Sequence, residues 1–237
     1  MEYIILAAGV GTRLYPYTKN TPKCLIRISE KETVIERAVR LIKENDSHAH
    51  ITVVVGFEAQ QIKTLLGDKC SFVTNPFYRI TNSVASLWFV RDLLQAGKPV
   101  VIINADIVFS QSLASVITQE PKDSVIYYDS SIHSNGDYNL QELNGDMVVM
   151  GKELGEYTGE YVGITKYTSK GAMSLYKEIE TMVSEELYDQ WYENGLVQMS
   201  LMMQEKFKVV DVCDYQWSEI DSIDNLLKIR QIIKHES

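Results

Sequence analysis

Short apolar runs alternate with amphipathic segments along the first hundred residues, and this alternation excludes most folds. The apolar runs at residues 3–8, 51–55, 72–74 and 100–104 have the length of buried strands, and residues 34–44, 59–66 and 83–94 have the apolar spacing of helices. A strand, a helix and another strand in this order form a right-handed βαβ unit. We therefore predict an α/β fold of Rossmann-like type, with a mostly parallel sheet flanked by helices.

The second half of the chain has a different pattern. Residues 140–143 and 147–150 flank Asn144-Gly145, a pair typical of a β-hairpin turn, and we expect this hairpin to form a lid or wall over the sheet. Further strands are predicted at residues 161–167 and 209–212, with helices at 170–182 and 223–233. Because no repeat or low-complexity linker interrupts the chain, we expect a single domain over residues 1–237.

Charge and composition argue against several classes of partner. The net charge is -9 and no block of Lys and Arg occurs, so neither nucleic acid nor a membrane is predicted as a partner. No apolar run approaches the roughly 20 residues of a membrane helix, and the amino terminus lacks the basic region of a signal peptide. Cys24, Cys70 and Cys213 form no metal or disulfide pattern, so we expect a cytoplasmic protein. The sequence does not indicate the oligomeric state.

A glycine-containing loop follows the first predicted strand, within Leu6-Ala7-Ala8-Gly9-Val10-Gly11-Thr12-Arg13-Leu14. Glycines there allow backbone N–H groups to approach a phosphate closely. Leu14 stands where G-x-G-x-x-G needs its third glycine, and no Walker A pattern occurs, which argues against a dinucleotide site and a P-loop. Arg13 and Lys23 bracket the loop, as suits a polyphosphate. The alternative is a tight turn with two solvated cations.

This loop, continued by Pro16, Thr18, Pro22-Lys23 and Leu25, resembles the signature of the sugar-nucleotidyltransferase superfamily. Three later segments are also similar to that superfamily: Asn104-Ala105-Asp106, Gly159-Glu160-Tyr161-Val162-Gly163-Ile164 and Trp217-Ser218-Glu219-Ile220-Asp221. The resemblance covers nearly the whole chain. It implies the nucleotide-diphospho-sugar transferase fold, and the transfer of a nucleoside monophosphate from a triphosphate to an acceptor with release of pyrophosphate.

The resemblance implies Asp106 and Asp221 as the ligands of a catalytic Mg²⁺. Asp106 follows a predicted central strand, at the edge where α/β sheets bind ligands, and Mg²⁺ prefers hard oxygen ligands. Glu219 and Asp224 are alternatives for the second ligand. The competing roles are a turn for Asp106 and a helix cap for Asp221.

The same resemblance implies that Arg13 holds the leaving pyrophosphate, Lys23 the α-phosphate and Lys152 the phosphate of the acceptor. Since such an acceptor is already an anion, the reaction needs no general base, and catalysis depends on positioning and charge neutralisation. Arg13, Lys23, Asp106 and Lys152 are therefore the expected catalytic residues. A surface position is the alternative for Lys152.

The segment Asn82-Ser83-Val84-Ala85-Ser86-Leu87-Trp88 stands where hexose-1-phosphate members carry Q-x-x-P-x-G-x-A. It is similar to the N-x-x-x-S-L-W/Y segment of bacterial phosphocholine-type and phosphonate-type cytidylyltransferases, which implies CTP as the donor. Asn82 can both donate to and accept from cytosine, and Ser86 could add a contact. Capping of the following helix is a compatible role for Asn82.

The acceptor is not identified by the sequence. Tyr188, Trp191, Tyr192 and Trp217 suit a quaternary ammonium group, although the first three also have the helical spacing of core residues. Glu153, Glu160 and Glu193 are candidates for meeting an amine. We predict CMP transfer from CTP to phosphocholine, an aminoalkylphosphonate or a phospho-amino acid. The alternatives are a sugar-1-phosphate nucleotidyltransferase that uses UTP or dTTP, and a non-catalytic nucleotide-binding regulator.

Overall fold

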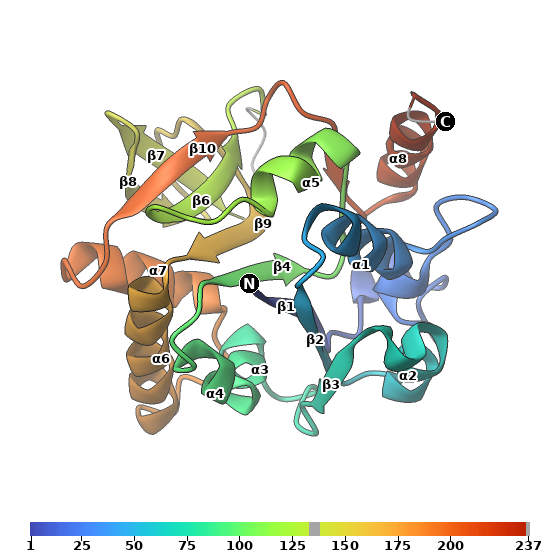
Figure 1. Cartoon of the computed structure of the whole chain (residues 1–237), viewed down its shortest axis with the longest axis horizontal. Helices are drawn as coiled ribbons and strands as arrows, with labels where there is room; N and C mark the ends of the chain where they lie inside the picture. The colour runs from blue at the N-terminus through green and yellow to red at the C-terminus, as the bar shows by residue number, and fades with distance from the viewer. Residues whose placement is uncertain (133–137, 236–237) are drawn as a thin grey trace. The chain divides into compact units, whose positions relative to one another are not determined.

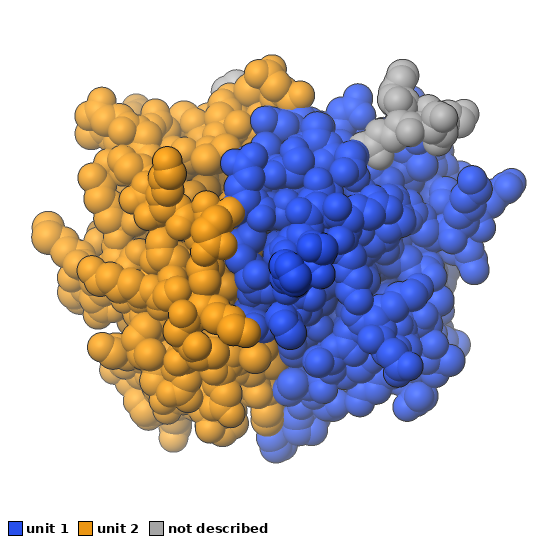
Figure 2. Space-filling model, in the orientation of Figure 1, with its two compact units in different colours: residues 1–80, 103–119, 215–237 blue, residues 81–102, 120–214 orange. Residues whose placement is uncertain are grey.

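The computed structural model describes residues 1–132 and 138–235, and the chain divides into two compact units (Figure 2). Unit 1 comprises residues 1–80, 103–119 and 215–237, and unit 2 comprises residues 81–102 and 120–214. The strand β4 (Val100–Asn104) leads from unit 2 into unit 1. In the described ranges, no helix has both the length and the apolar character needed to cross a bilayer.

Unit 1 contains the βαβ units that the sequence predicts. The strands β1 (Glu2–Ala7), β2 (His50–Val55) and β3 (Ser71–Thr74) form a parallel sheet in the order β3-β2-β1, with Ile5 paired to Val53 and Val53 to Phe72. The connecting helices are α1 (Val34–Asn45) and α2 (Ala59–Leu66), and they lie beside this sheet in Figure 1. α1 begins at a capping box in which Thr33 and Glu36 each satisfy a backbone N–H of the other.

A second, two-stranded sheet in unit 1 joins distant parts of the chain. Its strands β5 (Ile107–Phe109) and β11 (Trp217–Glu219) are antiparallel, and each is only three residues long. The sequence did not predict either strand, because so short a run carries no periodic signal. The remaining elements of unit 1 are the helices α5 (Gln111–Ile117) and α8 (Ile223–His235) and the 3₁₀ turns η1 (Thr12–Leu14), η2 (Lys23–Leu25) and η3 (Gly67–Lys69).

Unit 2 is built on a closed sheet of five strands. These are β6 (Ser124–Asp129), β7 (Asn139–Leu143), β8 (Asp146–Gly151), β9 (Gly159–Tyr167) and β10 (Phe207–Asp211). They follow the order β9-β6-β10-β8-β7, and a further pairing of β7 with β9 closes the ring. Within this ring only β6 and β10 are parallel, so the parallel pairing that the sequence predicts is characteristic of unit 1. The predicted hairpin at Asn144-Gly145 is confirmed, and its strands are part of the wall of this closed sheet.

The described part of unit 2 also contains the helices α3 (Ser83–Phe89), α4 (Arg91–Leu94), α6 (Ser169–Ser184) and α7 (Tyr192–Leu201). The single helix predicted over residues 83–94 is two helices, because Val90 leaves the helical conformation at φ -112° and ψ 14°. The helical interpretation of Tyr188 and Trp191 is wrong, since both precede α7 and only Tyr192 lies within it. α6 lies beside α3 and α4 (Figure 1).

Candidate active site

The antiparallel pairing of β5 with β11 brings two acidic segments together. Asp106 directly precedes β5 and Asp221 follows β11 after one residue, so antiparallel strands place both at the same end of the ladder. The register pairs Glu219 with Ile107, and the N–H of Ile220 donates to the carbonyl oxygen of Asp106 over 3.0 Å. The short sheet thus positions three carboxylates that are up to 115 residues apart by numbering.

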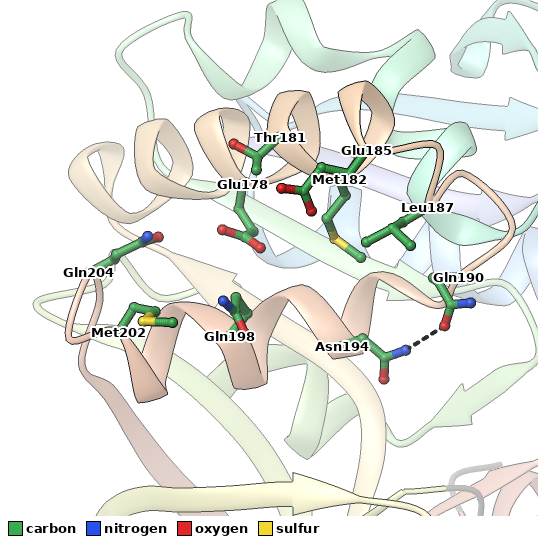
Figure 3. Close-up of a pocket in the computed structure, with 10 residues that line it drawn as sticks. All are labelled: Glu178, Thr181, Met182, Glu185, Leu187, Gln190, Asn194, Gln198, Met202 and Gln204. Atoms are coloured by element: carbon green, nitrogen blue, oxygen red, sulfur yellow. Dashed lines mark hydrogen bonds between the residues drawn. The ribbon is translucent and has the colours of Figure 1, made fainter.

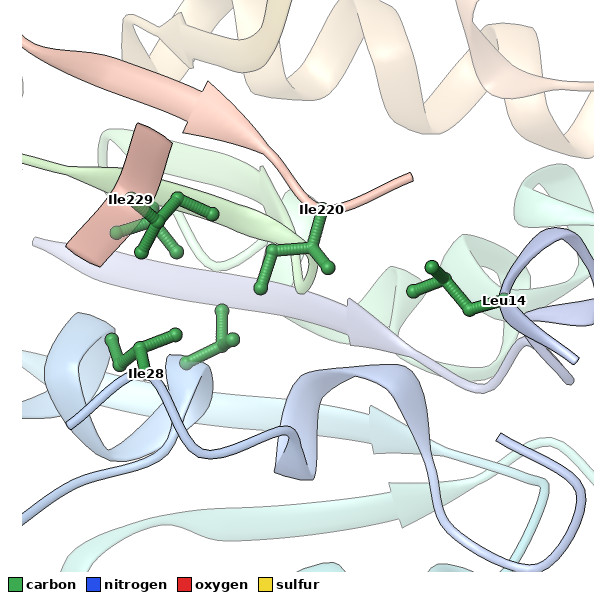
Figure 4. Packing of buried hydrophobic residues seen from close by; sticks show 6 residues of the cluster. Leu14, Ile28, Ile220 and Ile229 are labelled. Atoms are coloured by element: carbon green, nitrogen blue, oxygen red, sulfur yellow. The ribbon is translucent and has the colours of Figure 1, made fainter. Parts of the chain in front are cut away.

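A cluster of buried aliphatic side chains fixes the loop beside these carboxylates. Its members are Leu14, Ile28, Val34, Val108, Ile220 and Ile229 (Figure 4). Leu14 follows Arg13 and Ile220 precedes Asp221, so burial of the two apolar neighbours holds the two charged residues close together. Full burial of one such side chain contributes about 1.5–3 kcal/mol. The Arg13 guanidinium donates a hydrogen bond to Asp221.

Lys23 lies at the centre of the acidic cluster. Its Nζ donates to Oδ2 of Asp106 over 2.8 Å and to Oδ1 of Asp221, and it lies 3.5 Å from Oε1 of Glu219. Gly11 permits this arrangement, since it adopts φ 66° and a Cβ there would lie 3.1 Å from the Cβ of Lys23. Lys23 therefore neutralises part of the charge of three converging carboxylates.

Asp106, Glu219 and Asp221 have the composition of a divalent-cation site. One oxygen from each lies within 4.8 Å of the others, and carboxylate oxygens are the ligands that Mg²⁺ prefers. Glu219, which the sequence ranked below Asp221, belongs to this cluster, whereas Asp224 is exposed on α8 and lies outside it. Ser222, and not Asp221, caps α8, because the Oγ of Ser222 accepts a hydrogen bond from the N–H of Asn225 over 3.2 Å.

The charges in this cluster shift one another's pKa values. Burial raises the pKa of Glu219, and the nearby Asp106 and Asp221 raise it further despite the opposing charge of Lys23. Burial alone would raise the pKa of Asp221, but hydrogen bonding to Lys23 and the charges of Lys23 and Arg13 lower it. Burial tends to lower the pKa of Lys23, and the charges of Asp106 and Glu219 outweigh this and raise it. The cluster therefore favours additional positive charge.

The glycine-containing loop leaves the end of β1 with unused hydrogen-bond donors. Among the described residues, nothing accepts from the N–H groups of Gly9, Val10 and Gly11. Thr18 Oγ1 donates to the carbonyl oxygen of Gly11 over 2.6 Å and so fixes the turn. Leu6 and Ala7 lie within β1, Ala8 is buried, and Gly9 and Thr12 are exposed. Free backbone donors next to Arg13 and Lys23 can bind phosphate oxygens.

Unit 2 contains the residues predicted to contact the base. Asn82 Oδ1 accepts from the N–H of Ser83 over 2.9 Å, so the capping role considered for Asn82 is present at the start of α3. Ser86 lies in α3 and is buried, with 5% of its surface exposed. Contact of Asn82 and Ser86 with the base stays a prediction.

The residues predicted to bind the acceptor also lie in unit 2. The exposed Lys152 places Nζ 5.0 Å from the centre of the Trp191 ring and 5.7 Å from that of Tyr138, within the range of cation–π attraction. Glu160 is half-buried on β9. Tyr192 is fully buried and its hydroxyl lies 2.7 Å from that of Tyr161, which favours core packing over contact with an acceptor.

The loop with free N–H groups, the cations Arg13 and Lys23 and the three converging carboxylates lie at one edge of an α/β fold. This combination is typical of enzymes that transfer nucleotidyl groups, and comparison with known proteins supports this class. Residues 2–135, more than half of the chain, match the nucleotidyl transferase family, and the protein belongs to this family.

Relatives of known activity align along nearly the whole chain. It is 27% identical to the CTP:phosphoglutamine cytidylyltransferase of Campylobacter jejuni, over 95% of this chain and 98% of that protein. It is also 27% identical to the choline-phosphate cytidylyltransferase of Streptococcus pneumoniae, over 100% of both chains. The solved structure of the CTP:phosphocholine cytidylyltransferase of S. pneumoniae superimposes with a TM-score of 0.80 over 98% of both chains, at 23% identity, which confirms the predicted fold.

Proposed function

We propose that the protein is a cytidylyltransferase that transfers CMP from CTP to a small phosphorylated or phosphonylated acceptor and releases pyrophosphate. The observation that carries this proposal is the contact of Lys23 with Asp106 and Asp221 beside the Gly9–Arg13 loop. The cytidylyl specificity is supported by two relatives that are named as cytidylyltransferases and align over almost their full length.

In the proposed reaction, an oxygen of the acceptor attacks the α-phosphorus of CTP. A new P–O bond forms there, the bond from the α-phosphorus to the bridging oxygen breaks, and pyrophosphate leaves with the electron pair. Negative charge grows on the leaving group and on the α-phosphate oxygens. Arg13 and Lys23, which lie at the acidic cluster, would neutralise this charge, and the free N–H groups of the loop would add donors.

We infer Mg²⁺ as the metal, with Asp106, Glu219 and Asp221 as the residues that would hold it. Their hard oxygen donors fit this ion, and the shifted pKa of Glu219 marks a cluster of unbalanced negative charge. When bound, Mg²⁺ would supply positive charge to the phosphates of the nucleotide. Lys23 and Arg13 would then hold the triphosphate in position beside the bound ion.

We further infer that Asn82 and Ser86 contact cytosine, and that Lys152 binds the acid group of the acceptor. The named substrates of the two relatives, phosphoglutamine and choline phosphate, share a phosphate next to a nitrogen-bearing group. An acceptor of the same class suits a lysine flanked by the Tyr138 and Trp191 rings. The cytoplasmic setting and the single domain also stay predictions.

Pyrophosphate release in the presence of Mg²⁺ tests the proposal. CTP, UTP, dTTP, ATP and GTP are each combined with phosphocholine, 2-aminoethylphosphonate, phosphoamino acids or hexose-1-phosphates. We expect release with CTP and one non-sugar acceptor. Release only with UTP or dTTP and a hexose-1-phosphate would reject the cytidylyl assignment and leave Asn82 and Ser86 without their proposed role.

A further inference from the structure

A pocket of ≈ 700 Å³ lies between α6 and α7 in unit 2 (Figure 3). It is lined by Glu178, Thr181, Met182, Glu185, Leu187, Gln190, Asn194, Gln198, Met202 and Gln204. None of these residues has a role in the proposed nucleotidyl transfer. The volume is sufficient for a small organic molecule.

Glu178 is the feature of this pocket that most needs an explanation. Only 6% of its surface is exposed, and within residues 1–132 and 138–235 it makes no hydrogen bond and no ion pair. Its carboxylate points into the space between the two helices (Figure 3). Burial raises the pKa of Glu178, and the charge of Glu185 raises it further. The carboxylate faces the solvent-filled pocket and has no partner among the described residues, so a positively charged ligand can pair with it there.

The other lining residues indicate which partner fits. The lining contains no Lys, Arg or His, and Glu185 adds a second acidic group. Amide side chains contribute neutral polar contacts, and two of them are already paired, with Nδ2 of Asn194 donating to Oε1 of Gln190 over 3.0 Å. Met182 and Leu187 are apolar residues at one end of the pocket, and the exposed Met202 lies at the other (Figure 3). An extended cation with an alkyl part therefore matches this lining.

A metal ion without an organic part matches the lining of this pocket less well. A divalent ion in proteins takes several hard oxygen ligands at short range. Among the described residues, the one group of at least three acidic, histidine or cysteine side chains with converging ligand atoms is Asp106, Glu219 and Asp221 in unit 1. The thioethers of Met182 and Met202 are soft and apolar, and they suit an alkyl chain better than a hydrated ion.

We propose that the α6–α7 pocket binds a small organic cation, an ammonium group on a short alkyl chain, with Glu178 as its counter-ion. The ammonium group lies against the Glu178 carboxylate, with Glu185 adding attraction at the more exposed side. The alkyl part packs on the buried Met182. This site is independent of the proposed CMP transfer, and its test needs no catalysis.

Binding of 1,4-diaminobutane to the whole protein is measured by calorimetry and by NMR of ¹³C-methyl methionine, with excess Mg²⁺ present to occupy the acidic cluster of unit 1. Butane-1,4-diol serves as the uncharged probe of the same length. We expect the diamine to shift the methyl signal of Met182. Glu178→Gln should weaken binding by about tenfold, because the ammonium group loses its ionised hydrogen-bond partner.

Two further variants separate the pocket from general charge effects. Glu186→Gln removes one negative charge from the exposed turn next to Glu185 and should leave the dissociation constant unchanged. Glu185→Gln, at another exposed position, should weaken binding by a smaller factor than Glu178→Gln. Equal affinity of Glu178→Gln and the wild type would overturn the proposal. So would equal binding of the diol and the diamine, or an unchanged Met182 signal at saturation.

Discussion

Nζ of Lys23 donates a hydrogen bond to Oδ2 of Asp106 over 2.8 Å, although 83 positions separate the two residues along the chain. The same ammonium group donates to Asp221, which lies 198 positions away. Lys23 thus holds together two carboxylates that would otherwise repel each other. The cation of the phosphate-binding loop and the acidic cluster form one preorganised unit, and this relationship leads to the first two predictions.

Lys23→Met should lower kcat by about 10²–10³-fold, because its positive charge acts mainly on charge that develops in the transition state. The change in KM for CTP should be smaller. Steady-state pyrophosphate release measures both constants, and Lys19→Met, at an exposed position of the same loop, is the matched control. A rise in KM with an unchanged kcat would show that Lys23 contributes only to ground-state binding.

Asp106→Asn and Asp221→Asn should each reduce Mg²⁺-dependent turnover to the background rate while the protein stays folded. Both side chains are only partly buried, 25% and 24% exposed, so the amides fit without repacking. Turnover is followed over a Mg²⁺ titration and folding by circular dichroism. Asp224→Asn removes the same charge from the exposed start of α8 and should remain active. Near-normal turnover in either variant would remove that residue from the proposed metal site.

Two substitutions at Asn82 separate its capping role from base recognition. Asn82→Ala should destabilise the protein by about 1 kcal/mol, whereas Asn82→Ser keeps a capping oxygen and should cost less than about 0.5 kcal/mol. If Asn82 contacts cytosine, both variants raise KM for CTP. Urea unfolding and initial rates provide the two readouts. A serine variant with the wild-type KM would leave Asn82 as a helix cap alone.

Lys166 should make the stability depend on pH. It is 4% exposed on β9, and burial lowers its pKa to about 8, although the charge of Glu120 opposes the shift. Above about pH 8 the folded lysine loses its proton, while the unfolded one keeps it up to its usual pKa of roughly 10.4. In this range the unfolded state binds more protons, so the contribution of Lys166 to stability rises with pH.

The comparison with Lys166→Met isolates this contribution. The variant should be more stable than the wild type at pH 7, and the difference in free energy of unfolding should shrink between pH 8 and 10. Lys170→Met, at an exposed position, provides a control without such a trend. A difference that is constant over this range would show that Lys166 titrates alike in the folded and unfolded states.

Local sequence signals were sufficient to predict much of the fold. The apolar runs and helical spacing of residues 1–80 predict β1, α1, β2, α2 and β3 within one or two residues, and Asn144-Gly145 predicts the hairpin. These features depend on neighbours within a few positions, through side-chain periodicity and turn geometry. The loop from Gly9 to Lys23 and Asp106 were likewise recognisable as a candidate site, because glycines, cations and a carboxylate at a strand end are local patterns.

The membership of the acidic cluster was decided only by the tertiary structure. Glu219 joins Asp106 because β11 pairs with β5, and strands of three residues have too few positions for a period to show. Arg13 meets Asp221 over 208 positions because Leu14 and Ile220 share one buried cluster. Tyr192 is buried because of its position in α7. Such contacts depend on hydrophobic burial between distant segments, which is non-directional and therefore leaves no signature in the local order of residues.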